Sequence, residues 1–486
     1  MKGSSFFRSF GLISLLLAIF VALSGCSSRD ITVQPEEDQT SVIRNPAMGW
    51  VLYADAFADF PQAAEYWESQ DPYAGSASIF YVRLPWSQLE PQEGVYAWEN
   101  DQNFKDLIQG ALDRGLKLAF RVYVDSEGSY LQATPEYVKD AGAEGIVNTK
   151  TGRWDPYVDD PVFQKEFSLF IEAFGKEYND PAVVDFVDGN GLGRWGEGNR
   201  LKLQGGDKNG VLRWITEAYA TNFTRVLLGV QYNKSSTGFG LDNIDAVALG
   251  EHGYVIRKDT LGLPYWFTEA DKERIRSHFP GVPFYGENVY QYLQTKQRWS
   301  KDYATLRAAL EAVLNDALSL HANTLDLRLP EDTEAWFAEA PDLVQEFIVR
   351  GGYRLIPAKI TYPDRVEQGG EITITHTWKN TGVGVLPNNK PQWNYKYKVA
   401  FALIDPATGQ VVFRAVDNVA EPSAWIEGGQ YSYTLNASLD SVPAGSYSLG
   451  CAIIDSTMDN TPAVNLAILN ERTDSGWYIL GDISVD

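Results

Sequence analysis

The sequence is poor in the residue types that build metal sites and disulfide bonds. It has only 2 Cys and 4 His among 486 residues, and no two His residues have the spacing of a zinc-binding helix. If Cys26 carries a lipid, Cys451 is left without a partner for an internal disulfide. We therefore expect no metal centre and no disulfide framework.

Motifs of several enzyme classes are missing as well. The chain has no Gly-x-Ser-x-Gly turn, no phosphate-binding loop and no His-Glu-x-x-His zinc motif. Residues 189–193 include three glycines, but without the spacing that binds a dinucleotide ahead of a helix. These absences argue against serine-hydrolase, nucleotide-dependent and zinc-dependent chemistry, and we expect no cofactor.

Positive charge is scarce. There are 41 Lys and Arg residues against 64 Asp and Glu, which gives a formal net charge of −23. Such a surface repels phosphate backbones, so we expect no nucleic-acid partner and favour a neutral or cationic substrate. Aromatic residues are plentiful, with 14 Trp and 26 Tyr, and they suit either core packing or stacking on sugar rings.

The chain has one long apolar run, and it lies at the N-terminus. Two basic residues precede Phe10–Leu23, and Leu-Ser-Gly-Cys26 follows. This order predicts a secretory signal peptide over residues 1–25. The last four residues resemble the bacterial lipobox, which implies a lipid on Cys26 and a protein exported to the cell envelope, anchored at the outer membrane or cell surface. An ordinary signal peptide or an uncleaved anchor is the alternative.

The pattern after the signal changes twice. Residues 26–44 are polar and acidic, which predicts a tether. In residues 45–354, short apolar segments alternate with amphipathic helical ones, which predicts βα units around a parallel sheet. Eight strand-like segments can be counted, the number that closes a β/α barrel. They are Met48–Tyr53, Ser78–Leu84, Lys117–Val124, Val183–Asp188, Val226–Tyr232, Ala246–Gly250, Pro283–Gly286 and Thr324–Leu329.

The C-terminal part has a different period. From residue 371 onward, short runs of alternating polar and apolar residues are separated by turn residues. This pattern predicts a β-sandwich over residues 355–486. The predicted fold class is therefore α/β, a (β/α)8 TIM barrel, followed by an all-β immunoglobulin-like sandwich.

In such a barrel, the active site forms where the strands end. A glycine-rich segment with Trp195 and Glu197 follows the fourth predicted strand, and Glu287 ends the seventh. Glycoside hydrolysis needs two carboxyl groups: one protonates the leaving oxygen, and the other attacks the sugar or activates water. Strands four and seven lie across the barrel mouth from each other, so these two glutamates can face one sugar. The alternatives are an ordinary loop carboxylate and an acid at a helix N-terminus.

The segment Phe80–Trp98 resembles the second-strand region of clan A retaining glycoside hydrolases. It has Arg83 at the strand end, then Trp86 and a Glu-Pro…Gly…Tyr-x-Trp run. The resemblance implies that Glu197 is the acid/base, Glu287 the nucleophile and Arg83 the residue that orients it. The layout, with Asn-Pro-x-x-Gly-Trp and Trp-Gly-Glu motifs, also resembles a family of glycosidase-like bacterial lipoproteins of unknown function.

One departure from the clan concerns the acid. The clan has Asn directly before its acid/base Glu, where this chain has Gly196, and Glu197 lies well past the predicted strand end. Asp188 is nearer to that end and is the alternative acid. Glu251, after the sixth predicted strand, is an alternative nucleophile or a hydrogen-bonding residue of a sugar subsite.

Other side chains that follow the strands are candidates for contacts with carbohydrate. Trp86, Trp195 and Tyr290 are the candidates for stacking on a sugar face, with packing at the barrel top as the alternative. The polar and aromatic candidates are Tyr123, Asp125, Asp188, Asn190, Asn199, Gln231, Glu251, His252 and Arg328.

Taken together, these features predict an exported lipoprotein glycoside hydrolase. It would act by retention on extracellular or periplasmic glycan through Glu197 and Glu287. The alternative is a non-catalytic surface protein that binds glycan with the same barrel but without a working carboxyl pair, because a fold does not fix a function.

Overall fold

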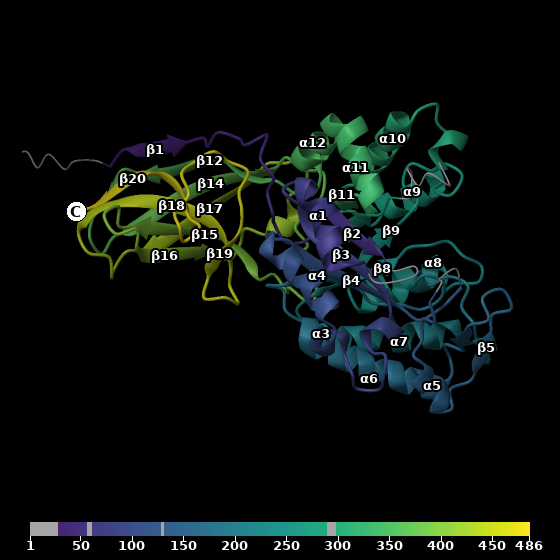
Figure 1. Cartoon of the computed structure of the whole chain (residues 1–486). Coiled ribbons are helices and arrows are strands. Elements are labelled where there is room, and N and C mark those ends of the chain that lie inside the picture. The colour runs from purple at the N-terminus through teal and green to yellow at the C-terminus, as the bar shows by residue number, and fades with distance from the viewer. Residues whose placement is uncertain (1–27, 56–60, 128–130, 289–297) are drawn as a thin grey trace, which may run out of the picture.

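The computed structural model describes residues 28–55, 61–127, 131–288 and 298–486. A β/α barrel and an all-β part lie next to each other, at the right and left of Figure 1. The predicted signal peptide and Cys26 lie outside the described residues. Within the described ranges, no helix is long and apolar enough to cross a membrane.

Eight parallel strands close into a barrel in the order β10-β11-β2-β3-β4-β7-β8-β9. This confirms the predicted eight-stranded barrel, and all but one of the predicted strand segments overlap an observed strand. The strands are β2 (Gly49–Asp55), β3 (Ala77–Pro85), β4 (Lys117–Tyr123), β7 (Val184–Asp188), β8 (Leu227–Gln231), β9 (Val255–Lys258), β10 (Phe284–Gly286) and β11 (Ala322–Asp326).

The exception is the sixth strand. The sequence predicts it at Ala246–Gly250, but these residues lie in a π-helix, η1 (Ile244–Glu251), and the strand is β9. Both segments are short apolar runs, and periodicity alone does not separate a buried helix from a buried strand. The shift matters for the site, because Glu251 and His252 come before the sixth strand and not after it.

Helices surround the barrel (Figure 1). Their N-termini carry side-chain caps where the sequence offers them: Asp101 accepts a hydrogen bond from the Phe104 amide, and Thr268 forms a capping box with Asp271. The helices are α1 (Ala63–Ala74), α2 (Trp86–Leu89), α3 (Ala97–Asn100), α4 (Gln102–Asp113), α5 (Glu136–Asp140), α6 (Pro161–Tyr178), α7 (Lys208–Asn222), α8 (Leu241–Asn243), α9 (Glu269–Arg276), α10 (Leu306–Ser319), α11 (Pro330–Glu339) and α12 (Pro341–Arg350).

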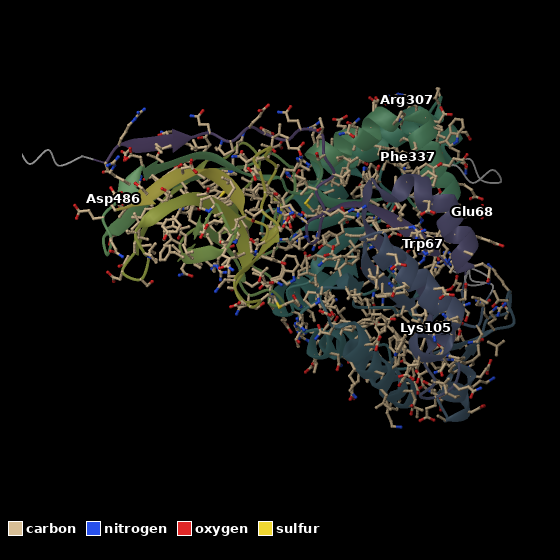
Figure 2. The ribbon with its side chains drawn as sticks, turned by 60° about the vertical axis from the view of Figure 1, so that its left-hand side comes forward. Trp67, Glu68, Lys105, Arg307, Phe337 and Asp486 are labelled. Carbon is tan, nitrogen blue, oxygen red and sulfur yellow. The ribbon has the colours of Figure 1, made fainter. Side chains whose placement is uncertain are left out.

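The helices pack mainly through apolar faces. On α1, Trp67 is buried and donates a hydrogen bond from Nε1 to the Leu107 carbonyl of α4 (3.0 Å), while Glu68 is exposed (Figure 2). On α10, Arg307 forms an ion pair with Asp342 of α12 (2.6 Å). These contacts hold the outer ring together and leave the loops at the strand ends to form a site.

The C-terminal part contains two sheets that share one core. Buried Trp378 of the first sheet and Phe401 of the second belong to the same apolar cluster. The immunoglobulin-like topology stays a prediction. The first sheet has the order β1 (Asp30–Val33), β12 (Leu355–Pro363), β14 (Glu371–Asn380), β17 (Tyr431–Ser438); the second has β13 (Arg365–Val366), β20 (Tyr478–Val485), β18 (Gly445–Asp455), β15 (Tyr397–Ile404), β16 (Val411–Asp417), with β19 (Thr461–Val464) on β18.

The segment predicted as a tether, residues 26–44, is structured where it is described. Strand β1 pairs antiparallel with β12, with Asp30 opposite Pro363. Further along, Glu37 forms an ion pair with Lys379 of β14 (3.0 Å). The polar composition of residues 26–44 did not indicate a strand, because an edge strand buries only alternate residues.

The β-part packs against the N-terminal ends of the barrel strands. Asn323 of β11 joins the two parts: its Nδ2 donates to the carbonyls of Ala47 (2.9 Å) and Val385 (2.7 Å), and its Oδ1 accepts from the Val385 amide (3.1 Å). The Tyr353 hydroxyl donates to the Pro46 carbonyl (2.6 Å). The opposite, C-terminal ends of the strands are therefore left for a site.

We predict that Asn323→Ala destabilises the protein by about 2–4 kcal/mol, because it leaves buried backbone groups without partners. The measurement is the free energy of unfolding in denaturant. Asn389→Ala is the matched control: Asn389 also bridges the two parts, but through one exposed hydrogen bond to Gly281 (3.2 Å), so we expect a loss of at most about 1 kcal/mol. Equal losses in the two variants would contradict the role given to Asn323.

Candidate active site

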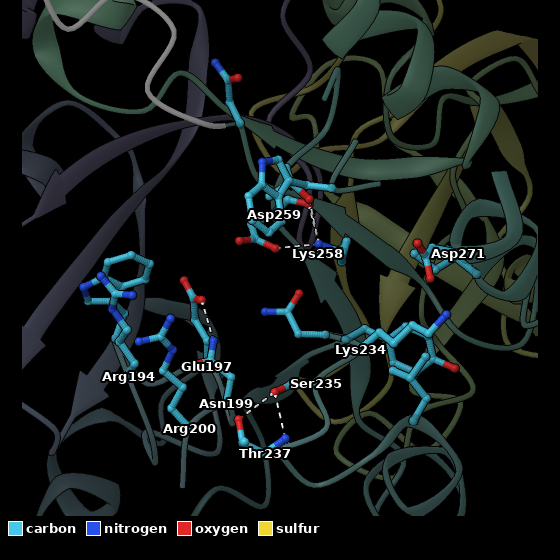
Figure 3. Close-up of a pocket in the computed structure, with 18 of the residues that line it drawn as sticks. Arg194, Glu197, Asn199, Arg200, Lys234, Ser235, Thr237, Lys258, Asp259 and Asp271 are labelled. Carbon is cyan, nitrogen blue, oxygen red and sulfur yellow. Dashed lines mark hydrogen bonds and ion pairs between the residues drawn. The ribbon is translucent and has the colours of Figure 1, made fainter. Parts of the chain in front are cut away.

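A cavity of about 480 Å³ opens at the C-terminal ends of the barrel strands (Figure 3). Its walls come from the strand ends and from the loops that follow them. The lining residues are Arg83, Arg194, Trp195, Glu197, Asn199, Arg200, Tyr232, Asn233, Lys234, Ser235, Thr237, Leu241, Lys258, Asp259, Thr260, Trp266, Asp271, Ile275, Asn288 and Arg328.

Glu287 follows β10 directly and is buried next to this cavity, whose lining includes its neighbours Asn288 and Arg328. Its Oε2 accepts hydrogen bonds from Gln231 Nε2 (2.8 Å), Arg121 Nη2 (3.0 Å) and Arg257 Nε (3.1 Å), and its Oε1 pairs with Arg328. Burial alone would raise the pKa of Glu287. The arginines outweigh it and hold that pKa well below the usual range of a glutamate. Glu287 is therefore a buried, stabilised anion.

The partners of Glu287 come from strand positions that face the barrel axis. Arg121 on β4 lies two residues after Ala119, and Arg257 on β9 lies two residues after Val255. Both Ala119 and Val255 belong to the barrel interior, and side chains in a strand alternate between its two faces. The strand period therefore aims both guanidinium groups at the axis.

Glu197 lies in the glycine-rich loop after β7. This loop turns through left-handed backbone at Trp195 (φ 59°) and Gly196 (φ 74°), and Gly196 has Arg121 and Tyr123 against its Cα, where a Cβ would meet them at 3.2 Å. Such conformations favour glycine and persist where the surroundings enforce them. They bring Glu197 back over the strand ends, although it lies far past β7 in sequence.

The environment of Glu197 favours its neutral form. Burial is the largest cause, followed by the charges of Asp259 and Glu287; Arg121 and Arg83 act in the opposite direction. Together they raise the pKa of Glu197 to about 7. Its Oε2 accepts a hydrogen bond from Asn199 Nδ2 (3.2 Å). Glu197 is thus a carboxyl group that can hold a proton near neutral pH.

One arginine connects the two glutamates. Nη1 of Arg121 lies 3.7 Å from Glu197 Oε1, and its Nη2 lies 3.0 Å from Glu287 Oε2. The two carboxyl groups thus face the two ends of one guanidinium, and their pKa values are shifted in opposite directions. Such a pair suits chemistry that needs one proton donor and one anion.

Arg83, predicted to orient Glu287, ends up close to the other glutamate. Its Nε donates to Asp55 Oδ1 (3.1 Å), and its Nη1 lies 3.7 Å from Glu197 Oε1. Its charge also contributes to the lowered pKa of Glu287. Arg83 therefore acts on both carboxyl groups.

Glu287 itself has no exposed surface. Arg328, which pairs with its Oε1, and Asn288 line the cavity above it. A third carboxylate, Asp259, lies on the cavity wall directly after β9, where it accepts a hydrogen bond from Lys258 Nζ (2.6 Å). Figure 3 shows Asp259 and Lys258 on the wall across from Glu197.

Several predicted substrate-binding residues meet at the cavity. Trp195, Asn199 and Arg328 line it, and Gln231 binds Glu287 from β8. Asp188, the alternative acid, lies below: its Oδ2 accepts from the Tyr81 hydroxyl (2.6 Å) and Arg121 Nε (2.8 Å), and it is almost fully buried. Asp188 thus fixes Arg121 and does not line the cavity.

Other predicted contacts lie elsewhere. Trp86 is fully buried against the aromatic face of α6, with Phe167 at 4.9 Å between ring centroids, so it is a core residue and not a sugar platform. Tyr123 and Asn190 are buried. Asp125 is buried in an ion pair with Lys202 (2.5 Å). All four lie outside the cavity lining.

Glu251 and His252 do not reach the site. Glu251 is exposed at the end of η1 and forms an ion pair with Arg213 of α7 (2.5 Å), so the alternative nucleophile is ruled out by position. His252 follows η1, outside the cavity lining. Both errors follow from placing the sixth strand one segment too early. Tyr290 lies outside the described residues.

Two arginines that contact Glu287, Arg121 and Arg257, were not predicted from the sequence. Arg121 is a charged residue within an otherwise apolar strand, at a position that faces the barrel axis. This pattern could have identified it as a candidate site residue from the sequence. Arg257 and Asp259 were hidden because the sixth strand was misplaced. Trp266 lines the cavity and is 64% exposed, which makes it a second aromatic surface there. Among the described residues, no group of His, Cys, Asp and Glu is arranged to hold a metal ion.

No protein-family model and no curated protein matches the chain. Solved structures with a similar fold include endo-glycoceramidase II from Rhodococcus sp. (14% identity, 81% of this chain and 99% of that chain, TM-score 0.41). Another is the catalytic domain of a beta-amylase from Paenibacillus polymyxa (9% identity, 63% of this chain and 99% of that chain, TM-score 0.43). A third is an exo-beta-1,4-mannosidase from Opitutaceae bacterium strain TAV5 (14% identity, 65% of this chain and 58% of that chain, TM-score 0.39).

We predict that Asp259→Asn lowers the pKa of Glu197 below about 7, because it removes a neighbouring negative charge that raises that pKa. The measurement is the intensity of the infrared band of protonated carboxyl groups as a function of pH. Subtracting the spectrum of Glu197→Gln isolates the contribution of Glu197. Asp271→Asn is the matched control, since Asp271 lines the same cavity but is not among the main causes of the shift. An unchanged pKa in Asp259→Asn would contradict this account of Glu197.

Proposed function

We propose that this protein is a glycoside hydrolase that acts by retention, with Glu197 as acid/base and Glu287 as nucleophile. The observation that carries the proposal is the carboxyl pair at the barrel mouth, one with a raised pKa and one with a lowered pKa, on either side of Arg121. Retaining and inverting glycosidases both need such a division of protonation between two carboxyl groups. The resemblance of Phe80–Trp98 to clan A retaining enzymes supports retention.

In the first step, a Glu287 oxygen forms a bond to the anomeric carbon while the glycosidic C–O bond breaks. The protonated Glu197 gives its proton to the leaving oxygen. In the second step, Glu197, now a carboxylate, takes a proton from water, and the water oxygen displaces Glu287 from the anomeric carbon. Both carboxyl groups return to their starting states.

Glu287 must first become accessible to the sugar. In this structure Arg328 pairs with its Oε1, and Arg328 also borders the cavity. We propose that Arg328 turns aside when substrate binds, while Arg121, Arg257 and Gln231 keep hold of Oε2. Oε1 is then the attacking oxygen, because it is the oxygen that loses its partner.

The proposal extends to location. The lipobox-like segment that ends at Cys26 supports export and a lipid anchor at the cell envelope. An anchored hydrolase would meet extracellular or periplasmic glycans. Trp195 and Trp266, which line the cavity, suit stacking on sugar rings.

We predict that Glu287→Gln lowers kcat/KM by more than about a thousandfold and Glu197→Gln by about 10²–10⁴-fold, because each removes a reacting carboxyl group. The measurement is hydrolysis of a panel of aryl glycosides and polysaccharides, with the configuration of the first-formed product read by NMR. Glu251→Gln, on the exposed surface, is the matched control and should keep full activity.

Three outcomes of this experiment would change the assignment. An inverted product would make Glu287 a base and not a nucleophile. Loss of activity in Asp259→Asn but not in Glu287→Gln would make Asp259, and not Glu287, the nucleophile. Glycan binding without hydrolysis in the unmodified protein would favour the non-catalytic binding protein.

We also predict the pH dependence of kcat/KM. Glu197 must be protonated, so activity is present below about pH 7 and falls as the pH rises through the pKa of Glu197. Glu287 must be ionised, and its pKa is lowered, so the acid limb lies below the usual glutamate value of about 4.3. Asp259→Asn should move only the alkaline limb, toward lower pH. An alkaline limb that does not move would contradict the role of Glu197 as acid.

A further inference from the structure

The charge of the cavity is opposite to that of the protein. The chain has a formal net charge of −23, but the cavity is lined by six basic side chains and three acidic ones. The acidic ones are Glu197, Asp259 and Asp271, and the basic ones are Arg83, Arg194, Arg200, Lys234, Lys258 and Arg328. The net charge of the chain favours a neutral or cationic substrate, whereas the charges that line the cavity favour an anionic one.

Three of the six basic residues form ion pairs with neighbouring carboxylates. Arg83 pairs with Asp55, Lys258 with Asp259 and Arg328 with Glu287. The remaining three are Arg194, Arg200 and Lys234; Figure 3 shows Arg194 and Arg200 on the same side of the cavity as Glu197, and Lys234 across from them. They are positive charges that the proposed carboxyl chemistry does not use.

Arg194 and Arg200 are neighbours on the glycine-rich loop. Both line the cavity; burial and the charge of Arg200 lower the pKa of Arg194, while the charges of Glu127, Glu197 and Asp125 act in the opposite direction. Arg200 pairs with Glu127 (2.5 Å), and its side chain is 55% exposed. For Arg194, no ion pair occurs within the described ranges. Glu127 therefore neutralises Arg200 in part, and Arg194 is the guanidinium on this wall that is left for an anionic ligand.

The same loop presents donors without partners. Nε of Arg194 and Nε1 of Trp195 are buried, and neither has a hydrogen-bond acceptor among the residues that the structure describes. The Arg194 guanidinium stacks on the Trp195 ring, 3.9 Å from its centroid. Arg194 and Trp195 thus form one stacked unit on the cavity wall, and no carboxylate of the described residues pairs with Arg194.

The backbone of the loop is arranged to hold these groups. Trp195 (φ 59°) and Arg200 (φ 51°) both adopt left-handed conformations, which non-glycine residues rarely do. Such strain is found where a fixed side-chain direction serves a function. Glu197 lines the same side of the cavity as Arg194 and Arg200 (Figure 3), so a group bound at these arginines would lie beside the proposed acid.

We infer that the cavity takes a sugar that carries a negative group, a carboxylate or a sulfate ester, held by Arg194 and Arg200 with Lys234 on the cavity wall. The inference rests on the proposed function for the sugar itself. The planar fork of a guanidinium suits either oxyanion, so the shared chemistry is that of an anion.

Binding to matched polysaccharides tests this inference. The purified full-length protein is run in affinity gels with polygalacturonate or its methyl ester, and with dextran sulfate or dextran. We expect retardation by the anionic member of at least one pair and none by its neutral partner. The protein's net charge of −23 opposes unspecific binding to polyanions, so retardation points to a local basic site. Binding of polygalacturonate identifies a uronate, and binding of dextran sulfate a sulfated sugar.

Variants locate the binding site. Arg194→Gln, and separately Arg200→Gln with Lys234→Gln, should weaken binding of the anionic member roughly tenfold to a hundredfold. The double variant changes only exposed side chains, so it remains informative if Arg194→Gln fails to fold. Arg225→Gln is the matched control: its side chain is also 55% exposed, but it precedes β8 at the other end of the barrel, and binding should be unchanged.

The outcomes separate this inference from the proposed function. Equal binding of neutral and anionic members, no binding of any, or no effect of the variants overturns the inference. Hydrolysis of matched aryl glucosides and glucuronides, in both anomeric forms, tests the enzyme separately. Hydrolysis of the neutral sugar alone, with unchanged rates in the variants, overturns the inference and leaves the glycosidase. Anion binding that the variants weaken, without hydrolysis of any substrate, overturns the glycosidase and leaves the inference.

Discussion

The site depends on the position of one guanidinium group, that of Arg121. It lies fully buried between Glu197 and Glu287 and is held from below by Asp188, at 2.8 Å from Nε. A buried charge is costly unless it is paired, and here each end of the guanidinium meets a carboxyl group. Removing Arg121 would leave two acids facing each other at the centre of the barrel.

The division of roles between the glutamates follows from the number of cations near each. Glu287 is contacted by Arg121, Arg257 and Arg328, whose charges exceed the penalty of burial. Glu197 has arginines only at 3.7 Å and a like charge in Asp259, so burial prevails. Two residues of the same type thus acquire opposite protonation states from their surroundings.

The architecture keeps the two halves of the protein to separate tasks. The β-part closes the N-terminal end of the barrel through Asn323 and Tyr353. In the part of the chain that the structure describes, these interface bonds come from the N-terminal ends of the strands, so the loops at the other end can vary in sequence and conformation. The strained glycine-rich loop uses this freedom, since it returns Glu197 and two arginines to one wall of the cavity.

The sequence alone determined the barrel, because eight buried strands between amphipathic helices leave few other arrangements. It also located Glu287, whose place at a strand end depends on local pattern. It failed at the sixth strand, where η1 and β9 are both short apolar runs, and so it missed Arg257 and Asp259. Only the tertiary structure decided which carboxyl groups share an arginine, and that a chain with an acidic surface has a basic cavity, because charges far apart in sequence act on each other through space.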